Sequence, residues 1–170
     1  MPPSCEERLV MKKLSHLDEN GHARMVDVTS KPITYRQAIA RGKVLMRPET
    51  AALIQEGGLP KGDVFSTARI AGIMAAKKTW ELIPMCHPLE ITHIELSFLC
   101  NASAGEVVVE AKTGTVGRTG IEMEAMTAVS VAALTIYDMC KAVDRAVVLT
   151  DIKLIKKEGG KSGVFVRQDE

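Results

Sequence analysis

Aromatic side chains are scarce in this sequence of 170 residues, because Trp, Tyr and Phe together make up only 4% of it. So few rings cannot form the stacking platform on which single-stranded nucleic acids bind. An excess of one charge is also missing: 22 Lys and Arg stand against 21 Asp and Glu, which gives a net charge of +1. The chain therefore has no general attraction for nucleic acid or an anionic membrane, and an anionic ligand needs a local basic cluster.

The sequence lacks a CxxC motif, and its cysteines, Cys5, Cys86, Cys100 and Cys140, are widely spaced. This spacing predicts neither a zinc ribbon nor a disulfide framework. No run of ~18 uninterrupted apolar residues occurs, and the N-terminal residues contain no apolar core of signal-peptide length. We therefore expect a cytoplasmic protein in a reducing compartment.

The composition is that of one globular domain, with 46% hydrophobic and 25% charged residues. A chain of this length supports one good hydrophobic core but not two large ones. Residues 1–24 are polar and show no sustained period, which is typical of a flexible N-terminal arm. We expect a single domain over residues 25–170.

Turn and capping residues predict two short helices in the first half of the domain. Pro48 suits the first position of a helix that stops at Gly57. Asp63 suits the N-cap of a second helix that runs towards Trp80.

The remaining pattern predicts strands. Residues 91–100 and 106–116 form a hairpin, residues 146–155 are extended, and residues 164–167 form a short last strand. Residues 33–46 are ambiguous, because TYRQAI could start a helix whereas KVLM looks extended. If they form a strand, the element order is that of an α+β, ferredoxin-like split βαβ fold, with helices covering one face of an antiparallel sheet.

The most informative segment is GIEMEAMTAVSVAALTIYDMCKA, residues 120–142. It predicts one long helix that is apolar almost all the way round and therefore buried. Its charged residues stand at the two ends, Glu122 and Glu124 near the start and Asp138 and Lys141 near the finish. Charges on a buried element need partners or a purpose.

A purely structural interpretation exists for both ends. Thr119 and Glu122 fit a capping box, and Asp138 and Lys141, three residues apart, fit an ion pair on one helix face. The sequence pattern alone leaves the structural and the functional interpretations open.

The segment IPMCHPL holds Met85, Cys86 and His87 in a stiff connection between two prolines. His87 is a candidate proton carrier or substrate donor, or merely a hydrogen-bonded histidine at a strand edge. No signal indicates an activated thiolate at Cys86, so a small buried residue is the better interpretation.

Two basic segments are candidates for phosphate binding. Lys61 precedes the second helix and could meet a phosphate at that helix's first amides, or could be a solvated lysine. The segment KKEGGKSG contains Lys157 and Lys161 but is no P-loop, because position 155 is Ile where the first glycine is needed. It indicates a flexible basic flap, or a plain turn.

Four long motifs together resemble the MoaC family of molybdenum cofactor biosynthesis. They are HLDENGHARMVDVTSK, KGDVFSTARIAGIMAAKKTWELIPMCHPL, GIEMEAMTAVSVAALTIYDMCKAVD and EGGKSG. The resemblance covers residues 15–163 and extends over nearly the whole chain.

This resemblance implies a catalytic domain over residues 25–170, in a homohexamer built as a trimer of dimers. The implied reaction converts 3′,8-cyclo-7,8-dihydroguanosine 5′-triphosphate into cyclic pyranopterin monophosphate and releases pyrophosphate. No cofactor is expected to be required, and a Mg²⁺ ion carried by the triphosphate would leave little trace in the sequence.

The resemblance also implies roles for single residues. Asp138, Lys141 and Lys61 match catalytic positions. Substrate contacts are implied at Met85, Cys86, His87, Glu122, Met123 and Glu124. Arg36, Lys157 and Lys161 match basic positions that face the triphosphate.

Helix geometry constrains these roles. Glu124 and Asp138 are fourteen positions apart, which in a straight helix separates them by ~21 Å. One small reacting centre cannot contact both within a chain, so we expect the two helix ends to belong to different pockets completed by neighbouring subunits. A nucleotide-sensing module without catalysis and a metal-dependent hydrolase using His87 and cysteines are the alternatives.

Overall fold

The computed structural model describes residue 20 and residues 22–168, so nearly all of the expected N-terminal arm lies outside the described residues. Within these residues, one antiparallel sheet has the strand order β2-β3-β1-β4-β5. The strands are β1 (Thr34–Leu45), β2 (His93–Asn101), β3 (Glu106–Gly117), β4 (Val148–Glu158) and β5 (Phe165–Val166). The first four have the order of a split βαβ unit, so the predicted α+β, ferredoxin-like class is confirmed.

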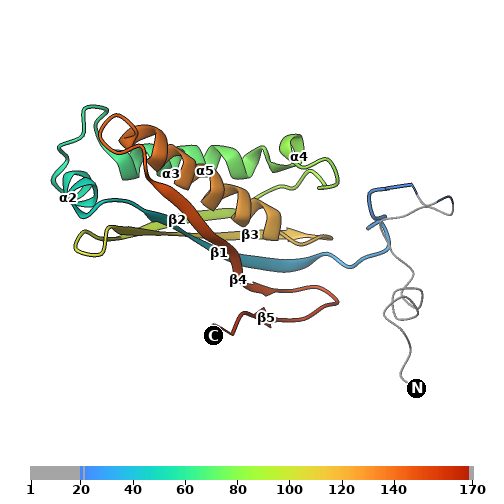
Figure 1. Cartoon of the computed structure of the whole chain (residues 1–170). Coiled ribbons are helices and arrows are strands. Elements are labelled where there is room, and N and C mark those ends of the chain that lie inside the picture. The colour runs from blue at the N-terminus through green and yellow to red at the C-terminus, as the bar shows by residue number, and fades with distance from the viewer. Residues whose placement is uncertain (1–19, 21, 169–170) are drawn as a thin grey trace, which may run out of the picture.

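One face of the sheet is covered by helices, with α3 and α5 side by side across it (Figure 1). The helices are α2 (Pro48–Glu56), α3 (Val64–Lys77), α4 (Thr79–Leu82) and α5 (Glu122–Cys140). The ambiguous residues 33–46 form β1, which pairs with β3 on one side and β4 on the other. The central position of β1 explains its strict alternation of buried and partly exposed residues.

Two glycines allow α5 to approach its neighbours closely. A Cβ on Gly72 of α3 would lie 2.6 Å from Leu96 Cδ2 and 2.9 Å from the Ala128 carbonyl oxygen. A Cβ on Gly42 of β1 would lie 2.8 Å from Val129 Cγ1. Gly72 therefore lets α3 approach the backbone of α5, and Gly42 leaves room in β1 for the Val129 side chain of α5.

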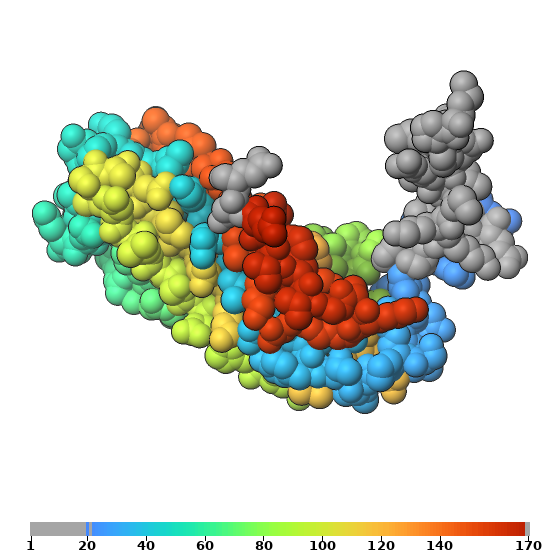
Figure 2. All heavy atoms as spheres, turned by 90° about the horizontal axis from the view of Figure 1, so that it is seen from below, coloured from blue at the N-terminus to red at the C-terminus, as the bar shows by residue number. Residues whose placement is uncertain are grey.

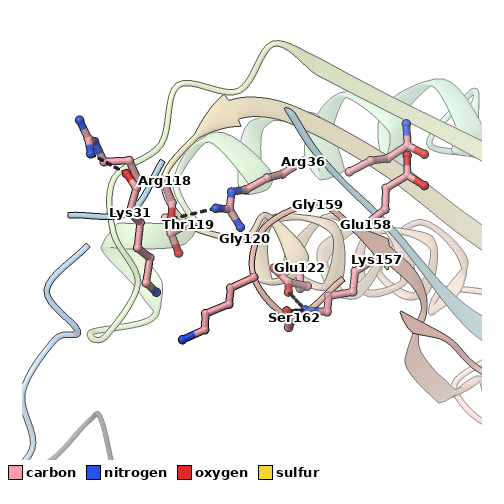
Figure 3. Close-up of a pocket in the computed structure, with 12 residues that line it drawn as sticks. Lys31, Arg36, Arg118, Thr119, Gly120, Glu122, Lys157, Glu158, Gly159 and Ser162 are labelled. Carbon is pink, nitrogen blue, oxygen red and sulfur yellow. Dashed lines mark hydrogen bonds and ion pairs between the residues drawn. The ribbon is translucent and has the colours of Figure 1, made fainter. Parts of the chain in front are cut away.

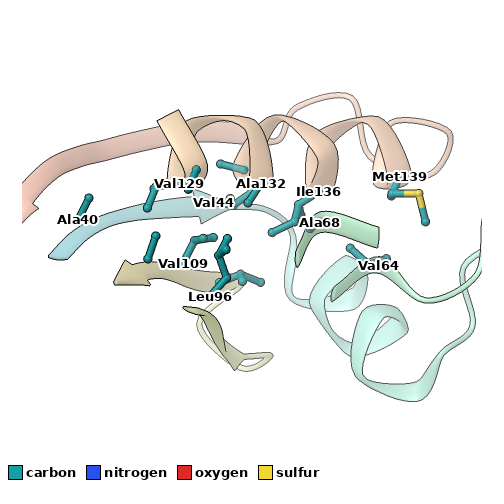
Figure 4. Close-up of a cluster of buried hydrophobic side chains, with 14 of the residues drawn as sticks. Ala40, Val44, Val64, Ala68, Leu96, Val109, Val129, Ala132, Ile136 and Met139 are labelled. Carbon is teal, nitrogen blue, oxygen red and sulfur yellow. The ribbon is translucent and has the colours of Figure 1, made fainter. Parts of the chain in front are cut away.

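The core lies between the helices and the sheet (Figure 4). Small and branched side chains of α5 fill it, including Val129, Ala132 and Ile136, all with 0% exposure. By length and composition α5 could cross a membrane, but 56% of that stretch is buried inside the protein, which is typical of a core helix. The predicted burial of α5 is thus largely supplied by its own chain.

One local prediction was wrong, and one of the interpretations left open by the sequence does not hold. The second helix does not continue to Trp80: α3 ends at Lys77, and the separate single turn α4 follows. The capping box at Thr119 is absent, because α5 begins after Ile121 without a side-chain cap. The Glu122 carboxylate instead turns back over Gly120, where a Cβ would overlap it, so the missing side chain of Gly120 leaves room for it.

The hairpin of β4 and β5 brings the C-terminal part of the chain against the segment before β1 (Figure 2). Strand β4 is irregular, because its register against β1 shifts at two places. At one of them Asp151 adopts a positive φ of 53°. Such bulges bend a strand, and here they precede the residues that reach the start of α5.

Candidate active site

A first cavity of about 330 Å³ opens at the start of α5. One wall is the glycine-rich connection between β4 and β5, which contributes Lys157, Lys161 and Ser162. Facing walls come from β1 and from the connection that leads into α5, with Arg36, Arg118 and Glu122 (Figure 3). The predicted basic residues of two separate segments therefore lie around one cavity together with the predicted residue Glu122 of a third.

Arg36 is the fixed point of this cavity. It is only 8% exposed, and its Nε and Nη2 donate to the carbonyl oxygens of Gly117 and Arg118 at 3.0 and 3.1 Å. A Cβ on Gly160 would overlap its Nη1, so the flap lies directly on the guanidinium. A cation held in place by backbone carbonyls is preorganised to meet an anion.

The flap lysines are less constrained. Lys157 Nζ lies 3.8 Å from Glu122 Oε1 and also donates to the Ser162 hydroxyl. Lys161 is exposed and lines the same cavity. Two ammonium groups thus border the space beside Arg36.

A second cavity of about 460 Å³ adjoins the first. Its lining brings together the predicted substrate contacts Met85, Cys86, His87, Met123 and Glu124, and it shares Glu122 with the first cavity. The connection after α4 and the first turn of α5 are therefore neighbours, although about 35 residues separate them.

Glu124 is the buried carboxyl group of this second cavity, with 4% exposure. Burial raises its pKa to about 7, and the nearby charge of Glu122 acts in the same direction. Burial, followed by the charge of Glu124, also raises the pKa of the Cys86 thiol. Near neutral pH, Glu124 can therefore exist with or without its proton, whereas Cys86 stays a thiol.

His87 holds the N-terminal segment over this cavity. Its Nε2 lies 2.8 Å from the carbonyl oxygen of Val26. Because a carbonyl oxygen only accepts, Nε2 is the protonated nitrogen in this contact. His87 is thus hydrogen-bonded, as one interpretation of the sequence had it, but it lies in the connection before β2 and not at a strand edge. Nδ1 is the nitrogen left for other partners.

The third group of predicted residues meets at the other end of α5. Asp138 accepts from Lys61 Nζ at 2.7 Å and pairs with Lys141 Nζ at 2.6 Å. The contact with Lys141, and to a lesser extent the contact with Lys61, lower the pKa of Asp138 to about 2. Asp138 in turn raises the pKa of Lys141. Lys61 therefore contacts Asp138 and not the first amides of α3. At that helix end the Asp63 side chain accepts from the Ser66 N–H.

The twelve predicted residues thus form two groups at opposite ends of α5, and Asp138 lines neither cavity that contains Glu122. Sequence reasoning missed Lys31, which lines both cavities. It also missed Arg118, which donates to the carbonyl oxygens of Thr29 and Lys31 and so fixes that segment. Neither residue lies in a helix or strand with an apolar period. Lys31 is the last residue of the motif HLDENGHARMVDVTSK, which was the only sequence signal for its segment.

A metal site of protein ligands has no support in residues 22–168, where no group of three or more His, Cys, Asp or Glu side chains is placed to hold an ion. Adjacent Cys86 and His87 lack a further ligand pair. The metal-dependent hydrolase considered from the sequence therefore has no ligand set in this range.

Comparison with known proteins gives a consistent result. The sequence model of the MoaC family matches residues 25–160. A protein of Desulfatibacillum aliphaticivorans is 58% identical over 158 residues, which cover 93% of this chain and 99% of the relative. A protein of Pelotomaculum thermopropionicum is 59% identical over 160 residues, 94% of each chain. A third, from Thermomicrobium roseum, is 57% identical over 160 residues, 94% of this chain and 96% of its own. All three are named cyclic pyranopterin monophosphate synthase.

Proposed function

The chain belongs to the MoaC family, and on this premise we propose that it is a lyase of an early step in molybdenum cofactor biosynthesis. It converts 3′,8-cyclo-7,8-dihydroguanosine 5′-triphosphate into cyclic pyranopterin monophosphate and releases pyrophosphate. The observation that carries this proposal is the pair of joined cavities, one basic and one with a buried carboxyl group. They suit the triphosphate and the base of one nucleotide.

The triphosphate binds in the first cavity. Arg36 supplies a preorganised guanidinium, and Lys157 and Lys161 close over the phosphates from the flap. These cations stabilise the negative charge that develops when pyrophosphate leaves. Lys31 lines the same space and adds a further positive charge.

The base binds in the second cavity. Glu122 and Glu124 accept hydrogen bonds from guanine amino and ring N–H groups. With a pKa of about 7, Glu124 can also donate one when protonated. Met85, Cys86 and Met123 supply contact area, and His87 orients the substrate or the segment that covers it.

Asp138, Lys141 and Lys61 perform the proton transfers. Cyclic phosphate formation joins a sugar hydroxyl oxygen to the α-phosphorus, breaks the bond to pyrophosphate and releases the hydroxyl proton. With a pKa of about 2, Asp138 is a weak base in the resting cluster. A substrate phosphate that draws one lysine away makes the carboxylate more basic, while the ammonium groups serve as proton donors.

The two groups of residues meet in a site shared between subunits of a homohexamer, a trimer of dimers. Their separation of ~21 Å along α5 supports this arrangement. The outer face of the helical layer also exposes apolar side chains, with Ile70 60%, Met74 56% and Leu134 56% exposed. Such a face is suited to burial against a further copy of the chain.

The reaction requires no cofactor bound by the protein, and a Mg²⁺ ion that accompanies the triphosphate is compatible with the oxygen-rich ligand. The cytoplasm, where GTP-derived substrates arise, is the expected compartment.

The direct test is to incubate the purified protein with the cyclised dihydro-GTP intermediate and to measure the pterin product and pyrophosphate. Stoichiometric formation of both supports the proposal. Absence of turnover by folded protein, with and without Mg²⁺, contradicts it.

Lys141→Ala separates the enzyme from the alternative, a nucleotide-sensing module that keeps the cavities but needs no acid or base. We expect this variant to bind the intermediate with nearly unchanged affinity and to lose turnover, by roughly 10²- to 10⁴-fold if general acid–base catalysis is removed. Binding is measured by calorimetry and turnover by pyrophosphate release. Unchanged turnover removes the role proposed for Lys141.

A further inference from the structure

A buried carboxylate fixes the turn that follows α5. The side chain of Asp144 is 2% exposed. Its Oδ2 accepts from the Arg47 backbone N–H and the Thr50 hydroxyl, both at 3.0 Å, and its Oδ1 accepts from the Ala146 N–H at 3.1 Å. The Arg47 guanidinium lies 3.4 Å from the carboxylate and also donates to the Val143 carbonyl.

Asp144 thereby joins two distant segments. Arg47 is the N-cap residue of α2 and makes no side-chain cap hydrogen bond, and Asp144 accepts from its backbone N–H and from the hydroxyl of Thr50 in the first turn of α2. The Asp144 N–H also donates to the Cys140 carbonyl at 2.9 Å, which closes the turn onto the last residue of α5. The turn is therefore fixed both to α5 and to α2.

Lys141 lies within this turn, directly after α5. A lysine side chain has four rotatable bonds and holds no single position by itself. Its ammonium lies 2.6 Å from Asp138 Oδ1 in a contact whose two side chains are about half exposed. The Lys141 backbone is held on one side by α5, where its N–H donates to the Tyr137 carbonyl at 2.9 Å, and on the other side by the turn that Asp144 fixes.

We infer that Asp144 is a positioning residue, whose buried carboxylate holds the turn so that Lys141 reaches Asp138. The effect on turnover rests on the proposed function, since it requires that Lys141 takes part in the chemistry. The effect on the Lys141–Asp138 contact does not.

Asp144→Asn is the main test variant. Both carboxylate oxygens accept hydrogen bonds, and an amide replaces one of them by an NH₂ group that cannot accept. The turn then loses at least one anchor. We expect kcat to fall by roughly tenfold or more, as for a misplaced catalytic group, whereas KM changes little because both cavities lie at the other end of α5.

The pKa of Asp138, followed by ¹³C NMR of its carboxyl carbon, gives a readout independent of activity. Lys141 and Lys61 are the charged groups that face this carboxylate and hold its pKa at about 2. We expect the Asp138 pKa to be higher in Asp144→Asn than in the wild-type protein. The double variant Asp144→Asn/Lys141→Ala should have the same Asp138 pKa as Lys141→Ala alone.

Two further variants keep the test decisive. Val109→Ala lowers stability through a cavity in the core between sheet and helices. Even if its melting temperature equals that of Asp144→Asn, it should leave the Asp138 pKa unchanged. Thr50→Val removes one donor to Asp144 and should shift kcat and the Asp138 pKa in the same direction, by less. If Asp144→Asn does not fold, Thr50→Val carries the test alone.

The outcomes separate the two proposals. An unchanged Asp138 pKa in both Asp144→Asn and Thr50→Val overturns the positioning role. A raised pKa with unchanged turnover supports the positioning role and contradicts the catalytic role proposed for Lys141.

Discussion

Among the described carboxyl groups, Glu124 is the one whose pKa lies furthest from its ordinary value. It is 4% exposed on the first turn of α5, and burial raises its pKa to about 7. The folded state therefore keeps a proton that the unfolded chain releases near its ordinary pKa of 4.5. The stabilisation from this proton is complete below pH 4.5 and is lost as the pH rises to about 7.

Glu124→Gln should therefore stabilise the protein at pH 8 but much less at pH 5. At pH 5 the buried glutamic acid and the amide are similar neutral groups, whereas at pH 8 the wild-type protein contains a buried carboxylate. We expect the stability difference between variant and wild type to grow by about 2 kcal/mol between these pH values. Chemical denaturation at both pH values measures it.

Thr127→Val is a suitable control for this prediction. Thr127 is 9% exposed and lies on α5 close to Glu124 without carrying a titratable group. Its stability difference from wild type should be the same at pH 5 and pH 8. An equally constant difference for Glu124→Gln would show that Glu124 is not the group that titrates.

At the residue scale, the sequence predicted residue types better than contacts. It identified the charged ends of α5, but the lysine pairing with Asp138 involves Lys61 as well as Lys141. Lys61 comes from a loop that precedes Asp138 by 77 positions, and no periodic pattern predicts such a contact. The burial of Glu124 was predictable only as part of a buried helix.

Among the elements, the flap between β4 and β5 offers a matched pair of glycines. Gly160 and Gly163 both have positive φ, 74° and 64°. A Cβ on Gly160 would overlap Arg36 Nη1, whereas nothing lies within 4 Å of a Cβ on Gly163. Alanine at either site meets a similar backbone penalty of about 1 kcal/mol, but only one displaces a guanidinium.

We therefore expect Gly160→Ala to raise KM several-fold and Gly163→Ala to leave it nearly unchanged. The physical reason is that the flap cannot close onto Arg36 without moving the cation from its carbonyl partners. Steady-state kinetics with the triphosphate substrate measures the difference. Equal effects of the two substitutions would indicate that backbone strain alone matters and that the flap does not act through Arg36.

Most element types were predictable because each had a local signal. Pro48 and Gly57 mark α2 as expected, and Asp63 caps α3 through Ser66. The break at Lys78 was not predictable, because the apolar period continues through it while Thr79 donates to the Ala76 carbonyl. The strand conformation of residues 33–46 is a tertiary effect, since β1 is stabilised by pairing on both sides.

At the scale of the whole molecule, a shared site predicts complementation between inactive variants. Arg36→Ala removes the fixed cation of the first cavity, and Lys141→Ala removes the proposed proton carrier at the other end of α5. In a mixed dimer, one site would combine the intact start of one α5 with the intact end of its partner. Mixing the two variants should then restore up to about a quarter of wild-type activity after random pairing.

The experiment requires dissociation and reassociation of the mixed subunits, or coexpression of the two variants. Two variants that carry different mutations at the same end, Lys141→Ala and Asp138→Asn, are the control and should not complement each other. If Arg36→Ala and Lys141→Ala also fail in verified mixed oligomers, each site is formed by a single chain.

The length of α5 has a consequence for insertions and deletions in related sequences. One residue added or removed inside a helix turns its ends by about 100° relative to each other and shifts them by ~1.5 Å. At one end Glu124 faces the second cavity, and at the other Asp138 faces two lysines, so neither end can rotate freely. We expect related chains to vary in length in the turn between β2 and β3, and to have the same number of residues from Glu122 to Cys140.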